Sequence, residues 1–327
     1  MIKSIKFEIE MEGQGIVNYD SNDQKYVPTK DRKYSRHNNE MFSKKNFYRN
    51  EEGEVFGKVK ISSDCIKKSI FNDQADIPNI SHNKNILNSY ISHPNRILRG
   101  YLLTDRKETI KRKGALNITD AEQICDARVY METFSKHQAK TSYKEHNEET
   151  GEDKSDNTFY KKETVGDIKY KASGNIDLSI LQFVPCDQIL DRYSFNPDTF
   201  ETYKKFLSRY FPNENSLELK KYIYKSNPFI PELGLKLSDE SVIKMVKKFL
   251  KNLFATEITR SSSFAKVSKL RIQLIEDPIT DNIEGRNYIE INSKEDIDNL
   301  EFQIEEFYRE ASEEEIEKFA IQLETEE

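Results

Sequence analysis

The sequence predicts an α+β fold whose compact body carries long polar insertions. Charged residues make up 33% of the 327 residues and hydrophobic residues only 36%, so much of the chain has to lie in solvated segments. Short stretches of alternating polarity predict strands, and stretches with apolar residues every three or four positions predict helices. In chain order these elements read β, α, β, a long arm, β, α, β. This order fits a ferredoxin-like sandwich with insertions.

The first quarter of the chain supplies two predicted strands and two predicted helices. Residues 3–11 alternate apolar and charged side chains, which predicts an amphipathic strand, and residues 55–61 predict a second strand. A serine then caps a predicted helix that ends at residue 71. A shorter helix is expected over residues 83–91.

A polar and basic loop, residues 20–54, separates the two strands. A loop of this length inside a compact domain is usually either functional or disordered. Aromatic residues are interleaved with the cations, and this favours a functional loop. The cations are Lys25, Lys30, Arg32, Lys33, Arg36, Lys44, Lys45 and Arg49, and the aromatic residues are Tyr26, Tyr34, Phe42, Phe47 and Tyr48.

Residues 96–103, with the sequence RILRGYLL, predict a buried strand that has Arg96 and Arg99 at its entry. Gly100 has no side chain, so another group can approach the backbone closely there. Lys107, Lys111, Arg112 and Lys113 then open a second insertion. Its centre, residues 136–154, is poor in apolar residues and predicts a flexible tip.

Residues 159–170 predict a two-stranded hairpin around Gly166 and Asp167 that is too polar to be buried on either face. Lysine neutralises phosphate and flat rings stack on unpaired bases, so the hairpin suits a nucleic acid. The alternative is a solvated edge hairpin whose lysines prevent aggregation. Residues 176–184 predict the core strand that anchors it. The hairpin residues concerned are Phe159, Tyr160, Lys161, Lys162, Lys169, Tyr170 and Lys171.

The C-terminal half predicts two helices, a strand and an acidic tail. Residues 198–210 and 238–253 have apolar residues at helical spacing, and residues 264–275 predict a strand. Residues 297–323 predict an acidic amphipathic helix, interrupted near Ser312. Its apolar face needs a surface to cover.

The charge of the chain is unevenly distributed. Residues 276–327 contain 4 Lys and Arg against 19 Asp and Glu, which gives a net charge of −15. The chain totals are 51 and 57, so residues 1–275 hold 47 basic and 38 acidic residues and a net charge of +9. The chain is therefore basic with an acidic tail, and the total of −6 does not argue against a nucleic-acid partner.

No motif for chemistry is present. The three cysteines, Cys65, Cys125 and Cys186, are widely spaced without a CxxC, and none of the five histidines shows metal-ligand spacing. The sequence has no GxSxG motif and no Walker A loop. We expect no metal, no cofactor and no catalysis. With no signal sequence and no long apolar run, we also expect a reduced, soluble, cytoplasmic protein without membrane contact.

Four collinear stretches resemble the crRNA-backbone subunits of Class 1 CRISPR effector complexes, the "seven" type of Cas proteins in the RAMP superfamily. The similarity is greatest to the variant type I-F form, and the type IV backbone subunit is a near relative. The stretches are IKSIKFEIEMEGQGIVNY, KVKISSDCIKKSIFNDQ, ILRGYLLT and TFYKKETVGDIKYKASGNIDLSILQFV, spread in order over residues 2–184.

The resemblance implies a single RRM-like palm over residues 1–327 that carries four further parts. They are a basic finger loop at 20–54, a thumb hairpin insertion at 105–175, a second helical insertion at 186–237 and an acidic C-terminal helix at 295–327. It also implies that the chain binds guide RNA, forms a filament with copies of itself, contacts other effector subunits and presents the guide to a complementary target. The implied RNA-binding residues are Asn18, Lys44, Lys45, Arg96, Arg99, Lys111, Arg112, Phe159, Tyr160, Lys161, Lys162 and Lys169.

Two alternatives remain open at the level of sequence. A metal-assisted ribonuclease of the type III backbone kind would use an aspartate of the first loop, such as Asp20, Asp23 or Asp31. A protein-interaction scaffold would use the hairpin for a protein partner and would hold no RNA.

Overall fold

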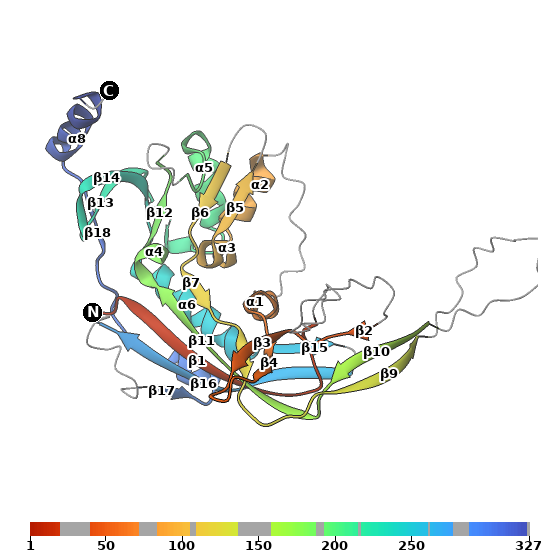
Figure 1. The fold of residues 1–327 in the computed structure, drawn as a ribbon. Coiled ribbons are helices and arrows are strands. Elements are labelled where there is room, and N and C mark those ends of the chain that lie inside the picture. Colours follow the sequence, from red (N-terminus) through yellow and green to blue (C-terminus); the bar gives the residue numbers. More distant parts are fainter. Residues whose placement is uncertain are drawn as a thin grey trace, which may run out of the picture.

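The computed structural model describes residues 1–19, 40–71, 84–104, 109–136, 158–187, 193–214, 217–260, 262–276 and 288–325. The fold is α+β, as the sequence predicts, with antiparallel sheets and helices packed against them (Figure 1). None of the described helices is long and apolar enough to cross a membrane.

The largest sheet has β1 at its centre. Its main path runs in the order β15-β16-β1-β11-β8-β4-β3, with β17 added beside β16 and β7 beside β11. Strand β1 pairs antiparallel with β11 on one side and with β16 on the other. The strands are β1 (Ser4–Gln14), β3 (Lys45–Arg49), β4 (Val55–Ile61), β7 (Leu116–Ile118), β8 (Ala121–Gln123), β11 (Asp167–Asp177), β15 (Glu257–Arg260), β16 (Ser263–Ile275) and β17 (Ile289–Ile291).

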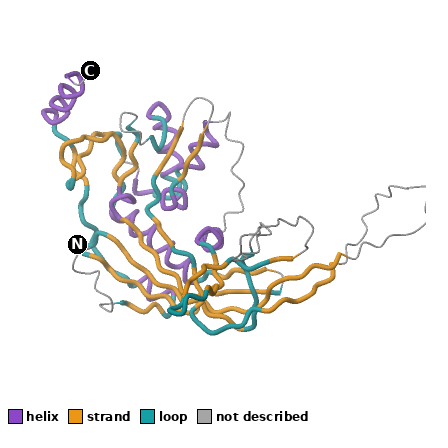
Figure 2. Tube along the Cα trace, in the orientation of Figure 1, coloured by secondary structure: helices purple, strands orange, loops and turns teal. Residues whose placement is uncertain are grey.

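Helices cover one face of this sheet and form the core with it (Figure 2). Every second residue of β1 points into the core, and Phe7 lies 5.5 Å from Phe249 between ring centroids. Ser238 caps the long helix through the amide of Ser241, as its sequence predicts. The predictions for β1, β4, the first helix, this long helix and β16 are confirmed. The helices of this layer are α1 (Ser63–Phe71), α4 (Leu178–Gln182), α6 (Asp239–Phe254) and α7 (Lys294–Asp298).

Two smaller units lie above one end of the large sheet (Figure 1). The first, called the helical lobe below, consists of α2 (Lys84–Ile91), α3 (Pro94–Arg99), β5 (Tyr101–Thr104), β6 (Thr109–Arg112), η2 (Pro197–Thr199), α5 (Phe200–Leu207) and η3 (Pro212–Glu214). The second is a four-stranded sheet in the order β12-β14-β13-β18. Its strands are β12 (Phe183–Pro185), β13 (Lys220–Tyr224), β14 (Asn227–Lys236) and β18 (Tyr308–Glu310).

An arm projects beyond the opposite end of the large sheet (Figure 1). It consists of β9 (Tyr130–Lys136) and β10 (Thr158–Thr164), which pair antiparallel, and β2 (Glu40–Met41), which adds to β10 in parallel. The predicted hairpin over residues 159–170 is therefore wrong in its pairing, because β10 pairs with β9 and not with β11. Strand β11 belongs to the large sheet, where its Ile168 and Tyr170 are buried. The alternation of aromatics with lysines reflects one buried and one solvated face.

Two predicted strands contain helices. The segment 96–103 begins in α3, because the His93 side chain accepts a hydrogen bond from the amide of Asn95 and Pro94 occupies the first turn. Only β5 is strand there. Within residues 176–184, Asp177 accepts hydrogen bonds from the amides of Ser179 and Ile180 and so starts α4. A local N-cap overrides strand propensity in both places.

The last two predicted parts also need correction. The segment 186–237 does contain α5, as predicted, but it also contains the strands β13 and β14. The acidic tail is not one helix: α7 and α8 (Glu313–Thr325) are separated by β18. The tail is tied to the body, since Ile2 donates its amide to Gln303 and Lys225 and Lys236 form ion pairs with Glu306.

The buried guanidinium of Arg112 joins three elements. Its Nε donates to the carbonyl of Ile97 at 3.1 Å, and its two Nη atoms donate to the carbonyls of Phe183 at 2.9 Å and Ile180 at 2.8 Å. These carbonyls belong to α3, β12 and α4. Burial lowers the pKa of Arg112, and the nearby tyrosines Tyr101, Tyr203 and Tyr308 act in the opposite direction. The side chain joins the helical lobe to α4 and to the four-stranded sheet.

Replacement of Arg112 is expected to destabilise the fold. The change Arg112→Ala leaves buried carbonyl groups without donors, and we expect the free energy of unfolding to fall by about 3 kcal/mol. The neighbouring Lys113 is exposed, so Lys113→Ala is expected to change it by less than about 0.5 kcal/mol. Urea unfolding of both variants measures the difference, and equal values contradict the structural role.

Truncations are expected to separate the two halves of the tail. Removal of α8 alone, by ending the chain at Ser312, is expected to leave a folded protein. Ending the chain at Glu276 removes β17, α7 and β18 with their buried apolar side chains, and each loses about 1.5–3 kcal/mol of burial. Thermal unfolding is expected to show a cooperative transition only for the first variant. The residues lost are Ile291, Ile297, Leu300, Ile304, Phe307 and Tyr308.

Candidate nucleic-acid interface

The base of the arm is fixed by the buried carboxylate of Glu163, on β10. One oxygen accepts hydrogen bonds from the backbone amide of Ser43 at 2.8 Å and from its hydroxyl at 2.5 Å. The other oxygen forms an ion pair with Lys45, at 2.8 Å from its Nζ. The carboxylate thus joins the arm to β3 and the residues just before it, which lie within the predicted finger loop, residues 20–54. We call these three residues the Glu163 clasp.

The segment that follows β1 is hydrogen-bonded to the residues next to the Glu163 clasp. Asn18 donates from its Nδ2 to the hydroxyl of Ser62 at 3.0 Å, and its carbonyl accepts from the amide of Lys44 at 3.1 Å. The carbonyl of Lys44 in turn accepts from the amide of Lys60. The sequence analysis names Asn18, Lys44 and Lys45 among the implied RNA-binding residues. In the structure, the hydrogen bond from the Lys44 amide to the Asn18 carbonyl places Asn18 next to the two lysines.

Cations gather around Cys65 on α1. Burial raises the pKa of this thiol, while Arg260, Lys68 and Lys44 act in the opposite direction by their charge. The three cations come from the β15 hairpin, from α1 and from the start of β3. Lys44 directly precedes Lys45 of the Glu163 clasp, so one of these cations lies next to the clasp.

Lys161 and Lys162, neighbours on β10, have opposite environments. Lys161 is exposed, as a phosphate contact requires. Lys162 is buried, burial lowers its pKa, and its ammonium lies 4.8 Å from the centroid of the Tyr19 ring. The Tyr19 hydroxyl donates to the carbonyl of Glu163 at 3.0 Å. Lys162 therefore packs within the base of the arm, contrary to its predicted exposure.

Two projecting hairpins expose aromatic rings beside these cations. On the β3–β4 hairpin, Phe47 is 49% exposed and Phe56 is 44% exposed, and on β9 Tyr130 is 47% exposed. The Tyr48 ring packs on Phe56 and lies 5.5 Å from the ammonium of Lys58. Sequence reasoning missed Phe56 and Tyr130. Phe56 lies near the start of β4, and Tyr130 lies in the second insertion. Neither residue belongs to a stretch in which aromatic residues alternate with lysines, so the sequence pattern did not point to them.

Arg96 and Arg99, which the sequence predicts at the entry of a strand, lie on α3 instead. Each guanidinium lies over an aromatic ring. The Arg99 guanidinium lies 5.2 Å from the centroid of Phe71 at the end of α1, and that of Arg96 lies 4.1 Å from Tyr90 on α2. Both side chains are partly exposed. A guanidinium over an aromatic ring is attracted to it as a cation–π contact.

The remaining predicted residues are spread over the molecule. Lys169 forms an ion pair with Glu12 at 3.0 Å, which raises its pKa, on the solvated part of the large sheet. Phe159 and Tyr160 lie on β10, opposite Ser135 and Phe134 in the strand ladder. Residues 20–39 of the finger loop, with the three loop aspartates, and residues 137–157 of the arm lie outside the described residues.

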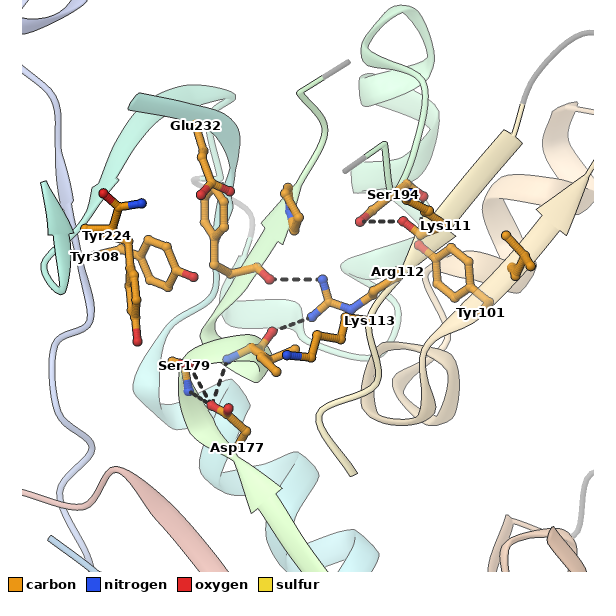
Figure 3. Close-up of a pocket in the computed structure, with 15 residues that line it drawn as sticks. Tyr101, Lys111, Arg112, Lys113, Asp177, Ser179, Ser194, Tyr224, Glu232 and Tyr308 are labelled. Atoms are coloured by element: carbon orange, nitrogen blue, oxygen red, sulfur yellow. Dashed lines mark hydrogen bonds between the residues drawn. The ribbon is translucent and has the colours of Figure 1, made fainter. Parts of the chain in front are cut away.

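Lys111 and Arg112 lie elsewhere, at a cleft of about 670 Å³ between the helical lobe and the four-stranded sheet (Figure 3). Arg112 is buried beneath it, so the predicted phosphate contact of Arg112 is not compatible with its position. Lys111 and Lys113 line the cleft. Within the described part of the chain, no group of three or more His, Cys, Asp or Glu side chains is arranged to hold a metal ion.

The Glu163 clasp makes a local prediction. Glu163→Ala removes the acceptor of the Ser43 amide and hydroxyl, so we expect faster amide hydrogen exchange in β2 and β10 but not in β1 or β16. The control Glu52→Ala changes an exposed turn residue and is expected to change neither. Hydrogen exchange mapped by mass spectrometry measures the protection of each strand. If the protection of β10 is the same in Glu163→Ala as in the wild type, the clasp does not fix the arm.

The solved structures similar to this chain belong to CRISPR complexes, at low identity. A chain of a "CRISPR RNA-guided surveillance complex" has 10% identity and a TM-score of 0.38, with 98% of this chain and 84% of that chain covered. A chain of a pre-nicking surveillance complex has 9% identity and a TM-score of 0.41, covering 87% and 83%. A chain of a "Type IV-B CRISPR Complex" has 10% identity and a TM-score of 0.29, covering 53% and 73%. These scores are too low to assign a shared fold.

Among curated protein sequences, none is significantly similar to this chain. A family model described as "Type I-Fv CRISPR-associated protein Cas7fv-like" matches residues 1–278, which include the Glu163 clasp, α3 and both projecting hairpins. The match spans all of the large sheet except β17 and confirms the family resemblance seen in the sequence. The chain belongs to the Cas7fv-like family of type I-Fv CRISPR-associated proteins.

Proposed function

We propose that the chain is a non-catalytic, guide-RNA-binding backbone subunit of a CRISPR interference complex. The observation that carries this proposal is the pair of projecting hairpins, β3–β4 and β9–β10, joined at their base by the Glu163 clasp. Both expose aromatic rings, and each has a cation beside it in the chain, Lys44 before β3 and the exposed Lys161 on β10. In a member of the Cas7fv-like family, such a surface suits a single-stranded RNA, because cations hold phosphates and rings stack on bases.

A ferredoxin-like palm is part of the proposal. The order β16-β1-β11-β8 is antiparallel throughout. Along the chain, α1 lies between β1 and β8, and α6 lies between β11 and β16. This arrangement supports a split βαβ pattern. The β3–β4 hairpin is then the described part of the finger, and β9–β10 is the thumb.

The proposed grip reads the RNA backbone and not its sequence. Lys44, Lys161 and Arg99 are the proposed phosphate contacts, with Arg96 and Lys45 beside them. Lys45 is shared with Glu163, so it positions the arm as well. Sequence specificity then comes from pairing between the guide and its target, as in other guided complexes.

The proposed partners follow from this role. They are the guide RNA, the complementary target strand, further copies of the chain in a filament, and other effector subunits, all in the cytoplasm. The basic body and the acidic tail of one chain have opposite charges, which supports association between copies.

Purification with a matching guide tests the proposal. The protein is isolated from cells that express a CRISPR array, absorbance at 260 and 280 nm is followed over a sizing column, and bound RNA is sequenced. Large particles that carry protected guide RNA are expected. A nucleic-acid-free monomer at low salt contradicts the proposal and favours a protein scaffold. Regular cleavage of paired RNA that is lost on replacement of Asp20, Asp23 or Asp31 favours a ribonuclease instead.

Arg99 is expected to contribute one phosphate contact. In Arg99→Ala, the slope of log affinity against log salt is expected to fall by about 0.7 for single-stranded RNA, while Arg99→Lys retains the slope. Lys318→Ala removes one exposed cation from the acidic α8 and is the matched control, with no expected change. Filter binding at several salt concentrations gives the slopes. An unchanged slope for Arg99→Ala assigns Arg99 a structural role.

A further inference from the structure

The cleft between the helical lobe and the four-stranded sheet lies apart from the β3–β4 and β9–β10 hairpins. It adjoins α3, because Gly114, next to Lys113, packs against the backbone of Arg99. Figure 1 places β6 and β14, which line it, away from β3 and β10. Its volume of about 670 Å³ is in the usual range for sites that bind small molecules. Nothing in the proposed function uses this cleft.

Aromatic rings form one wall of the cleft. Tyr308 stacks on Phe183 with ring centroids 4.5 Å apart, and Tyr224 lies 5.1 Å from Tyr308. Figure 3 shows Tyr101 on the opposite side of the cleft. Leu102, which is 65% exposed, also lines the cleft. The Tyr101 hydroxyl donates to the carbonyl of Ser194 at 2.7 Å, which fixes this ring. A flat group gains stacking energy against aromatic rings of this kind.

The cleft also holds a cation that is available to a ligand. Lys113 is exposed, and among the described residues its ammonium has no hydrogen-bond or ion-pair partner. Lys111 lines the same cleft. Two acidic residues are present as well: Asp177 caps α4 through the amides of Ser179 and Ile180, and Glu232 is buried. Neither shares an ion pair with Lys113.

Part of the aromatic wall comes from outside the family match. Tyr308 lies on β18, whereas the match ends at residue 278. Strand β18 pairs with β13 and so places Tyr308 against Tyr224. The C-terminal segment of this chain therefore completes a wall that residues 1–278 leave open.

We propose that the cleft is a second nucleic-acid site, which takes one unpaired nucleotide with its base against Tyr224 and Tyr308 and its phosphate at Lys113. A nucleotide matches this lining, because its flat base can stack on the aromatic rings while its anionic phosphate contacts the lysine. The site does not depend on guide binding at the arm. Guide RNA, a displaced or target DNA strand, and a free mononucleotide all offer this chemistry.

Photocrosslinking of the full chain tests the proposal. A 4-thiouridine-labelled oligouridylate and a 4-thiothymidine-labelled oligothymidylate are irradiated with the protein at low salt, and crosslinked peptides are mapped by mass spectrometry. Crosslinks to peptides that contain Tyr224 or Tyr308 are expected, in addition to those at the two hairpins. If uridine monophosphate lowers the crosslinks at the cleft but not those at the hairpins, a free nucleotide is sufficient to fill the cleft. The relative crosslinking of the two oligomers shows whether the cleft prefers RNA or DNA.

Variants keep the test specific. Lys113→Glu is expected to reduce the cleft crosslink by up to about fivefold, the effect of one exposed charge contact, and Tyr224→Leu about five- to hundredfold, the effect of one stacked base. Lys205→Glu on α5 reverses an exposed charge outside the cleft and is the matched control. Thermal unfolding verifies that each variant is folded.

The outcomes separate the two proposals. The cleft site is overturned if the wild-type protein crosslinks only at the hairpins. It is also overturned if Lys113→Glu and Lys205→Glu give equal crosslinks at the cleft. Neither result affects the proposed guide binding. Crosslinks at the cleft without any at the hairpins support the cleft site and contradict the proposed guide-binding surface.

Discussion

The position of the helical lobe depends on the buried guanidinium of Arg112. A buried cation is costly unless each donor meets an acceptor, and Arg112 meets the carbonyls of Ile97, Ile180 and Phe183. These carbonyls lie at the ends of α3 and α4 and at the start of β12, where helix and strand ladders leave acceptors unused. One side chain therefore sets both the orientation of α3, which carries Arg96 and Arg99, and the floor of the aromatic cleft.

A carboxylate has the equivalent role at the other end of the molecule. Glu163 joins two segments that are far apart in sequence, the start of β3 and the base of the arm. Because it holds Lys45, the charge of that ammonium is already balanced within the protein. The exposed rings of Phe47, Phe56 and Tyr130 lie on hairpins whose base is already ordered, and this lowers the entropy cost of the RNA binding proposed above.

The sequence predicted the elements with strong periodicity and failed where local chemistry or distant pairing decides. The alternation in β1 and the capped stripe of α6 depend only on nearby residues, and both were predicted correctly. The N-caps His93 and Asp177 turn strand-like apolar runs into α3 and α4. The partner of β10 is β9, across a long insertion, and no local pattern shows such pairing. For the candidate site, charge and ring content indicated the segments that carry the two hairpins. They did not distinguish the exposed Lys161 from the buried Lys162 and Arg112, because burial depends on the tertiary fold.

The central place of β1 has a consequence for synthesis of the chain. Ser4 pairs with Ile275, so the first strand made receives its β16 partner only when almost all of the chain has been translated. At roughly 5–20 residues per second this delay is roughly 10–50 seconds. During that time one edge of an apolar strand stays unpaired, which is a template for aggregation. Pairing with β11 on the other side leaves this edge open, so the nascent chain needs another means of shielding it, such as a chaperone, until β16 has been made.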